Sequence, residues 1–508
     1  MHTKIYSATI SGMNAHLVTV EVDFDESSSR SEFTIVGLPD TAIRESRKRI
    51  TTALKNNGFI LPNHKITVNL SPASLRKEGT LFDLPIALGI LKSIGALGLS
   101  DSYLNSSIII GELSLDGSIN PIKGVLAISS DALKLGKQRI ILPVGNSQEA
   151  ALIKDVEVIG LSHLKEIFET VTGKLTTKPT KVDLNAFIKK QKDNSLSFDS
   201  IKGQNYAKRA AQIAAAGKHN IIFSGSPGSG KTMLAKCIIT IMPDMRFDEI
   251  IQTTKIYSVG GKLDGKDIIA DRPFRSPHHS TTRTALIGGG AYIVPGEISL
   301  AHNGILFLDE ITEFSKESLE SLREPIENKH INIARAKESI QFPTDILLVA
   351  AYNPCPCGFY GEKLKQCKCS PSKVNLYQSK LSGPLLDRID MRIGVKTLDY
   401  TEATNKVISS SISATELKAG VDKAILTQNK RFGYAKSNSN MNINDIEQFC
   451  TLTPEAEIII QKAFTRLNLS MRAYHKVLKL SRTIADIDGS DKIEVKHITE
   501  AIMYKYEK

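Results

Sequence analysis

Short, uninterrupted apolar runs alternate with amphipathic stretches through the middle of this chain. The runs at residues 221–223 and 305–308 contain only Ile, Leu and Phe, and residues 346–351 form a third. Such runs are typical of parallel strands covered on both faces, since a half-exposed strand would alternate apolar and polar residues. The first run is followed by a glycine-rich turn and a helix-like stretch. The pattern predicts an α/β domain built on a central parallel sheet.

The part of the chain before this region shows the same alternation with shorter runs. Strand-like and helix-like stretches are found at residues 66–70, 85–94, 108–111, 139–143 and 147–152. They predict a mixed α/β domain. Residues rich in Lys, Thr, Asp and Ser then indicate a linker, and a helical period dominates the C-terminal part. The predicted divisions are residues 1–172 (first domain), 173–200 (linker), 201–397 (parallel-sheet core) and 398–508 (helical domain).

The glycine-rich turn after the first run has the composition of a triphosphate-binding loop. It consists of Gly225, Ser226, Pro227, Gly228, Ser229, Gly230, Lys231 and Thr232. Backbone N–H groups of such a loop point at phosphate oxygens, helped by the positive end of the following helix. Lys231 can reach the β- and γ-phosphates of ATP, and the Thr232 hydroxyl can bind Mg²⁺. The alternative is a glycine turn that only caps a helix. The flanking strand and helix favour nucleotide binding.

The second and third apolar runs end in polar residues suited to ATP hydrolysis. Asp309 and Glu310 follow residues 305–308, and Asn353 follows the third run. We expect Asp309 to hold Mg²⁺, together with Thr232, and Glu310 to polarise the attacking water. Asn353 would orient that water. A buried strand ending in a solvated acidic turn is the alternative, and the glycine-rich loop makes it the weaker one.

Two arginines later in the chain are candidates for contacts with the γ-phosphate. Arg388 lies between acidic residues in the segment 382–390, and Arg472 lies on a basic helix-like stretch. Arg388 is either an exposed ion-pair partner, worth little, or an arginine finger donated across a subunit boundary. Arg472 could contact the nucleotide from a helical lid.

These motifs, in this order, resemble the AAA+ ATPases, in the branch that includes magnesium chelatase and the MCM helicases. Residues 353–358, 381–390 and 472–475, with residues 33–40 near the start, resemble the YifB/ComM family of Mg-chelatase-like proteins. The resemblance covers nearly the whole chain. It implies Lys231 and Thr232 in Walker A, Asp309 and Glu310 in Walker B, Asn353 as sensor 1, Arg388 as the arginine finger and Arg472 as sensor 2.

The resemblance also implies a hairpin before sensor 1, at residues 328–336. In related hexameric helicases such hairpins project into the central channel and touch DNA. Lys329, His330 and Arg335 are the candidate DNA contacts here. An ordinary solvated β-turn is the alternative, and the sequence does not decide between the two.

Residues 71–83 and 111–124 are similar to the Lon protease domain around its catalytic serine and lysine. The serine position holds Leu81 and the lysine position holds Leu126. A serine–lysine dyad needs a hydroxyl and an amine. We therefore expect a Lon-like (ribosomal S5 domain 2-like) α/β fold without peptide hydrolysis by that route. Lys77 and Lys123 are interpreted as solvated surface residues.

The composition favours a polyanionic partner. Lys and Arg outnumber Asp and Glu by 65 to 54, which gives a net charge of +11. Nucleic acid or an anionic membrane would suit this charge. No apolar run is long enough for a membrane span, and the first residues lack an apolar signal core. We expect a cytoplasmic protein with reduced thiols and no membrane partner.

Four of the six cysteines form two close pairs within residues 355–369. They are Cys355, Cys357, Cys367 and Cys369. Four thiolates can close a tetrahedral zinc site. The alternative is a thiol-bearing loop stiffened by prolines, and both readings stay open. His278 and His279, which are adjacent to each other in the sequence, are not interpreted as metal ligands. Adjacent side chains on an extended chain point to opposite faces.

The leading functional hypothesis is an ATP-driven, homo-hexameric motor with ATP and Mg²⁺ as cofactors. By resemblance, it would act on branched or single-stranded DNA and promote branch migration during recombination in natural transformation. The principal alternative is a magnesium-chelatase-like ATPase subunit that remodels a protein partner. An ATP-dependent protease is disfavoured by Leu81 and Leu126. A nucleotide-gated binding module without hydrolysis is the fourth hypothesis.

Overall fold

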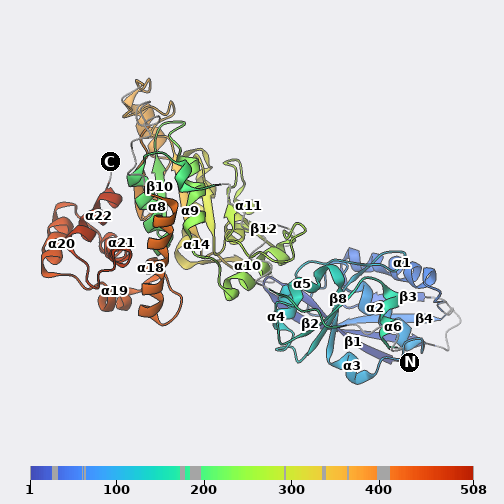
Figure 1. Ribbon diagram of the computed structural model, residues 1–508. Helices are drawn as coiled ribbons and strands as arrows, with labels where there is room; N and C mark the ends of the chain where they lie inside the picture. Colours follow the sequence, from blue (N-terminus) through green and yellow to red (C-terminus); the bar gives the residue numbers. More distant parts are fainter. Residues whose placement is uncertain are drawn as a thin grey trace. The chain divides into compact units, whose positions relative to one another are not determined.

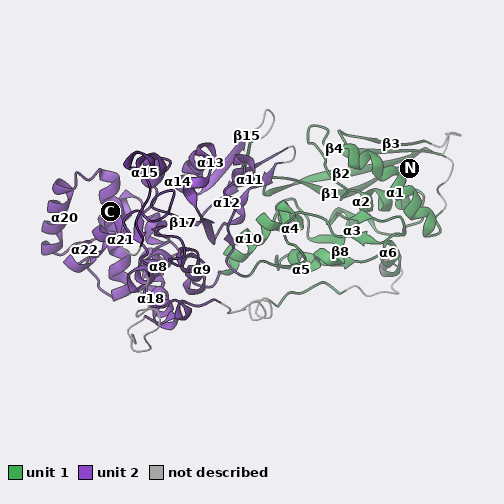
Figure 2. Ribbon diagram, turned by 90° about the horizontal axis from the view of Figure 1, so that it is seen from above, with its two compact units in different colours: residues 1–191, 246–270, 334–341 green, residues 192–245, 271–333, 342–508 purple. Residues whose placement is uncertain are grey.

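The computed structural model describes residues 2–25, 32–59, 61, 64–171, 178–183, 196–290, 293–334, 339–362, 365–397 and 412–506. Two compact units divide the chain (Figure 2). Unit 1 comprises residues 1–191, 246–270 and 334–341. Unit 2 comprises residues 192–245, 271–333 and 342–508. The predicted linker, residues 173–200, lies largely outside the described residues.

The two larger sheets of unit 1 have four and three strands. The first has the order β1 (His2–Ser11), β2 (Asn14–Asp25), β4 (Lys65–Ser71) and β3 (Glu32–Val36). Only the β3–β4 pair is parallel. The second sheet is parallel and comprises β5 (Ser107–Ile109), β8 (Arg139–Pro143) and β9 (Glu157–Leu161). Strand β2 buries alternate residues, as a strand with one face on a core should. The predicted mixed α/β character of this part is confirmed.

Helices of unit 1 cover these sheets. Helix α1 (Thr41–Asn56) begins at Asp40, whose carboxylate caps the helix by accepting from the Ile43 N–H. Helix α2 (Asp83–Ser93) packs on β1 and β2, and Lys92 is its only residue that is not buried. A helix that is apolar on all sides is expected at the centre of a domain. Helix α5 (Ser147–Ala150) is shorter than the stretch predicted from the sequence.

Helix α10 (Phe247–Gly260) belongs to unit 1, although it lies between the Walker motifs in the sequence. It packs against α4 (Val125–Asp131). The Gly124 N–H donates to the Ser258 carbonyl at 3.1 Å. Two segments of the core domain predicted for residues 201–397, residues 246–270 with α10 and residues 334–341, therefore fall in a different compact unit.

Unit 2 contains the predicted parallel sheet. Its five strands have the order β11 (Phe274–Arg275), β14 (Ile305–Leu308), β17 (Leu347–Tyr352), β10 (Ile221–Ser224) and β18 (Met391–Gly394). All four pairings are parallel. The three apolar runs predicted as strands correspond to β10, β14 and β17, so that prediction is confirmed. The carboxyl ends of these strands meet at one edge of the sheet.

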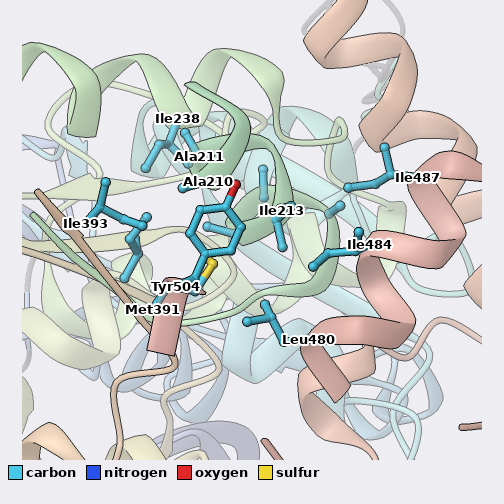
Figure 3. Close-up of a cluster of buried hydrophobic side chains, with 14 of the residues drawn as sticks. Ala210, Ala211, Ile213, Ile238, Met391, Ile393, Leu480, Ile484, Ile487 and Tyr504 are labelled. Atoms are coloured by element: carbon cyan, nitrogen blue, oxygen red, sulfur yellow. The ribbon is translucent and has the colours of Figure 1, made fainter. Parts of the chain in front are cut away.

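Successive residues of these strands enter two separate cores, which explains the uninterrupted apolar runs. Ile221 and Phe223 belong to one cluster, whereas Ile222 belongs to the other. Helices α8 (Asn205–Gly217) and α9 (Lys231–Ile241) contribute Ala210, Ala211, Ile213 and Ile238 to the first cluster (Figure 3). Both faces of the sheet are thus covered.

The C-terminal part is helical, as predicted, from residue 414 onward. It comprises α18 (Ala414–Phe432), α19 (Ile443–Phe449), α20 (Pro454–Arg466), α21 (Met471–Asp488) and α22 (Val495–Tyr506) (Figure 1). Leu480, Ile484, Ile487 and Tyr504 pack into the same cluster as α8. Among the helices of the described ranges, none has both the length and the apolarity that crossing a membrane requires.

Candidate active site

The glycine-rich loop joins β10 to α9 at the carboxyl edge of the sheet. Gly228 and Gly230 have φ values of +79° and +92°, a region that favours glycine. Gly225 has no room for a side chain, because a Cβ there would lie 2.4 Å from the Val395 carbonyl oxygen. Gly230 is the N-cap of α9, so the free N–H groups of the first helical turn face the loop. This is the local geometry that binds a phosphate.

Lys231 connects the loop to the tip of β17. Its Nζ donates to the carbonyl oxygens of Gly225 and Ser226 at 2.8 and 2.9 Å, and to Asn353 Oδ1 at 3.2 Å. Burial lowers the pKa of Lys231, and the nearby Asp309 and Glu310 oppose that shift. The structure thus brings together the predicted phosphate-binding lysine and the predicted sensor asparagine.

Thr232 and Asp309 form the second contact across this edge. The Thr232 hydroxyl donates to Asp309 Oδ2 at 2.8 Å. Hydroxyl and carboxylate oxygens are the hard donors that Mg²⁺ prefers, so the pair fits the predicted metal position. The Asp309 carboxylate also accepts from the Glu310 N–H at 3.0 Å, which fixes the turn after β14.

Glu310 follows the carboxyl end of β14 and lies near His279, which the sequence did not indicate as part of the site. Its side chain is 56% exposed, and one carboxylate oxygen lies 3.9 Å from Nδ1 of His279. The rings of His278 and His279 lie 4.0 Å apart, so the expectation that they point to opposite faces is wrong. The chain turns at this point, with the Thr281 N–H bound to the His278 carbonyl, and strand alternation does not apply. No motif in the sequence indicates the proximity of His279 to Glu310.

The two candidate arginines belong to a second cluster. Arg388 and Arg472 both form ion pairs with the carboxylate of Glu327. Arg388 also donates to the carbonyl oxygens of Arg323 and Pro384 at 3.0 and 2.7 Å. A pocket of about 310 Å³ adjoins this cluster, and its lining contains none of the residues of the glycine-rich loop. Sequence reasoning did not indicate that the two arginines share one carboxylate.

Two of the three candidate DNA contacts, Lys329 and His330, lie within the described residues. Lys329 pairs with Asp345 at 2.7 Å and with the side chain of Asn440. Burial lowers the pKa of Lys329, and Asp345 opposes that shift. His330 is half-buried in β15 (His330–Ala334), which pairs with β16 (Ser339–Pro343). Arg335 lies outside the described residues.

The positions that correspond to a protease dyad are apolar and buried. Leu81 is 9% exposed and Leu126, in α4, is fully buried. Lys77 is also fully buried, and its Nζ donates to the carbonyl oxygens of Gly37 and Pro72. The interpretation of Lys77 as a solvated surface residue is therefore wrong. Burial lowers its pKa.

The four predicted metal-ligating cysteines lie in the loop between β17 and α15 (Pro371–Gln378). Their Sγ atoms all lie within 4.8 Å of one another. This is the one group of metal-ligating type among the residues that the structure describes.

Three family models match the chain. The family described as "Magnesium chelatase, subunit ChlI" matches residues 197–403, and its C-terminal family matches residues 411–505. The family "Subunit ChlI of Mg-chelatase" matches residues 20–146.

Full-length relatives point to one family. The chain is 40% identical to the competence protein ComM of Haemophilus influenzae over 99% of this chain and 97% of the relative. It is 38% identical to YifB of Escherichia coli, over 99% and 96% respectively. A partial match to Lon protease 2 of Bacillus subtilis, 23% identical over 32% of this chain and 31% of the relative, agrees with the Lon-like similarity. The chain belongs to the YifB/ComM family of Mg-chelatase-like AAA+ proteins.

Proposed function

We propose that the protein hydrolyses ATP as a homo-hexameric ring and uses the energy to move branched DNA. The separation of the catalytic groups carries the proposal. Lys231, Thr232 and Asp309 converge with Asn353 at the edge of the sheet, whereas Arg388 and Arg472 meet at Glu327. A site of this kind is completed by the arginines of a neighbouring subunit, because an arginine finger acts on the γ-phosphate bound next door.

Each candidate site residue has a definite part in the proposed reaction. The loop N–H groups and Lys231 bind the phosphates of ATP. Thr232 and Asp309 would hold Mg²⁺, which neutralises charge on the phosphate oxygens. Glu310 accepts a proton from the attacking water, and Asn353 orients that water. The arginines stabilise the charge that develops on the transferred phosphoryl group.

A mixing experiment tests whether the arginines act between subunits. Lys231→Ala removes the phosphate-binding lysine, and Arg388→Ala removes the finger, so each variant alone should be inactive. In rings formed from equal amounts of both, about a quarter of the interfaces pair an intact loop with an intact finger. We expect ATP turnover to return in the mixture. Turnover absent from a mixture that forms mixed rings would overturn the shared site.

DNA is proposed as the partner on the basis of charge and similarity. The net charge of +11 suits a polyanion, and one relative is named a competence protein. We propose a cytoplasmic role in recombination during natural transformation. His330 and Arg335 are the proposed hairpin contacts, and Lys329 joins them once it leaves Asp345. Turnover measured with and without a four-stranded junction tests this. Absence of both junction binding and stimulation would exclude the DNA motor.

Remodelling of a protein partner is the second candidate, because three magnesium chelatase subunit families match the chain. That function predicts ATP turnover stimulated by a large protein rather than by DNA. Isolation of the Glu310→Gln variant with bound ATP, followed by identification of what remains attached, separates the two candidates. A DNA junction supports the motor, and a stoichiometric protein supports the chelatase-like role.

A further inference from the structure

The four clustered cysteines have the geometry of a closed metal site. Cys355 Sγ lies 3.3 Å from Cys357 Sγ and 3.7 Å from Cys367 Sγ, and the latter two are 3.5 Å apart. In a tetrahedral zinc–thiolate site with bonds of about 2.3 Å, neighbouring sulfurs are about 3.8 Å apart. A disulfide would bring two sulfurs to about 2.05 Å, and all four thiols are free. The separations fit a shared ion better than cross-linked pairs.

The surroundings of the sulfurs support this assignment. Cys355 is fully buried and the other three cysteines are half-buried, so the cluster is a compact centre rather than a set of surface thiols. The Cys369 N–H lies 3.4 Å from Cys367 Sγ and donates to it, as a backbone amide does to a metal-bound thiolate. We propose that Cys355, Cys357, Cys367 and Cys369 bind one zinc ion. Four protein ligands leave no open position, so the ion is structural.

The loop that carries these cysteines, residues 353–370 and called the zinc loop below, supports the glycine-rich loop directly. Ser226 donates to Glu362 Oε2 at 2.9 Å, and Thr397 donates to the same oxygen at 3.1 Å. Gly358, in the left-handed region with φ +84°, lies so close to Pro227 that a Cβ there would be 2.4 Å from the proline ring. The zinc loop therefore contacts two of the residues that shape the phosphate-binding turn.

The far end of the zinc loop reaches the acidic half of the site. Helix α15 follows Cys369, and Gln378 at its end donates to the Pro354 carbonyl at 3.0 Å. The Thr312 hydroxyl, two residues after Glu310, donates to the hydroxyl of Tyr377 at 2.6 Å. The zinc ion thus fixes a connection between the glycine-rich loop, Asn353 and the turn after Asp309. Its loss should loosen all three.

Metal analysis of the full-length protein tests the assignment. We expect about one zinc per chain after purification without added metal, and release of that zinc when a mercurial reagent titrates the thiols. Cys357→Ser and Cys367→Ser should lower the zinc content severalfold, whereas the matched Cys450→Ser, a buried cysteine away from the cluster, should not. A wild-type protein with fully reduced thiols and no zinc, or one with iron in its place, would overturn the proposal.

The coupling to the nucleotide site has a separate readout and rests on the proposed function. In Cys367→Ser, the affinity for ATP should fall severalfold while circular dichroism shows a folded chain. Stoichiometric zinc without any ATP turnover would leave the metal site standing and refute the proposed function. Full ATP affinity in a folded, zinc-free variant would refute the support of the loop by zinc.

Discussion

At the scale of single residues, the backbone of Glu310 is under local strain. Its φ of +48° lies in the left-handed region, which non-glycine residues seldom adopt. Such a conformation costs about 1–3 kcal/mol and persists only where the surroundings enforce it. Here the Glu310 N–H donates to the Asp309 carboxylate, and the Glu310 side chain is 56% exposed. The strain is consistent with a residue placed for a reaction rather than for packing.

The proposed role of Glu310 is tested by Glu310→Gln, which keeps the shape of the side chain and removes its basicity. Turnover of ATP should fall at least about 100-fold, the usual contribution of a general base. Binding of a fluorescent ATP analogue should be retained, because the glycine-rich loop is untouched. Glu317→Gln, at an exposed position in α13 (Lys316–Ser321), is the control and should keep its turnover. Equal loss in both variants would assign the effect to charge alone.

Glu149 makes the stability of unit 1 depend on pH. Burial raises the pKa of Glu149 to about 7, although Asn146 donates to its carboxylate at 2.7 Å. The folded protein therefore holds a proton between about pH 4.5 and 7 that the unfolded chain releases. The stabilisation is full below that range and is lost as the pH rises through 7. The difference amounts to about 3 kcal/mol.

Glu149→Gln should remove most of this dependence. Urea unfolding followed by circular dichroism at pH 5 and pH 8 measures it. The urea concentration at the unfolding midpoint should be lower at pH 8 than at pH 5 in the wild type. The difference between the two midpoints should be smaller in Glu149→Gln. The control is Asp155→Asn, at an exposed position on the same unit, which should behave as the wild type does. An identical pH profile in Glu149→Gln would contradict the assignment of the buried proton.

Charged residues were the hardest to place from the sequence. Lys77 and Lys329 look like surface lysines, yet Lys77 is fully buried and Lys329 is paired within unit 2. Each of them has an acceptor far away in the sequence: Lys77 donates to Gly37 and Lys329 donates to Asn440. A local pattern contains no information about such partners. Motif residues are easier to place, since the positions of Lys231 and Asp309 follow from nearby glycines and strand ends.

At the scale of elements, the apolar runs predicted the central strands because both faces of the sheet are covered. The same reasoning did not place α10. Ile250 and Ile256 are among its buried residues, so one side of the helix is covered. The apolar pattern alone does not identify the element that covers it. Only the fold reveals that α10 packs on α4 of unit 1. Element type follows from local periodicity, whereas the choice of packing partner depends on the whole chain.

The contact between the zinc loop and the glycine-rich loop can be tested with two glycines. Gly358 and Gly361 have nearly equal φ values, +84° and +82°, so an alanine costs about 1 kcal/mol of backbone strain at either position. Only at Gly358 would the new methyl group meet Pro227. Gly358→Ala should weaken ATP binding severalfold with the zinc content unchanged, and Gly361→Ala should bind ATP normally. Equal ATP affinities in the two variants would exclude the packing role of Gly358.

At the level of the complete chain, the residues around the glycine-rich loop and the Arg388–Arg472 pair form two separate clusters, and under the proposed function each chain would be incomplete by itself. The motifs around Arg388 and Arg472 suggested their roles, but not that one carboxylate, Glu327, holds both. A sequence motif suggests the role of its own residues. Whether two motifs far apart in the sequence meet in space depends on the fold. Under the proposed function, a phosphate from a neighbouring subunit replaces Glu327 as the partner of these arginines.

A shared site makes ATP turnover depend on assembly. Turnover per chain should fall as the protein is diluted, because rings dissociate by mass action and a separated chain has no neighbour to supply its arginines. Steady-state ATPase assays over a dilution series, with light scattering at each concentration, should show turnover and ring content falling together.

Lys231→Ala serves as the matched control, because it should lose turnover at every concentration while its dilution curve for assembly stays close to that of the wild type. A chain that scatters as a monomer and hydrolyses ATP at the undiluted rate would show that Arg388 is not needed from a neighbour. The ring would then have no catalytic reason to form.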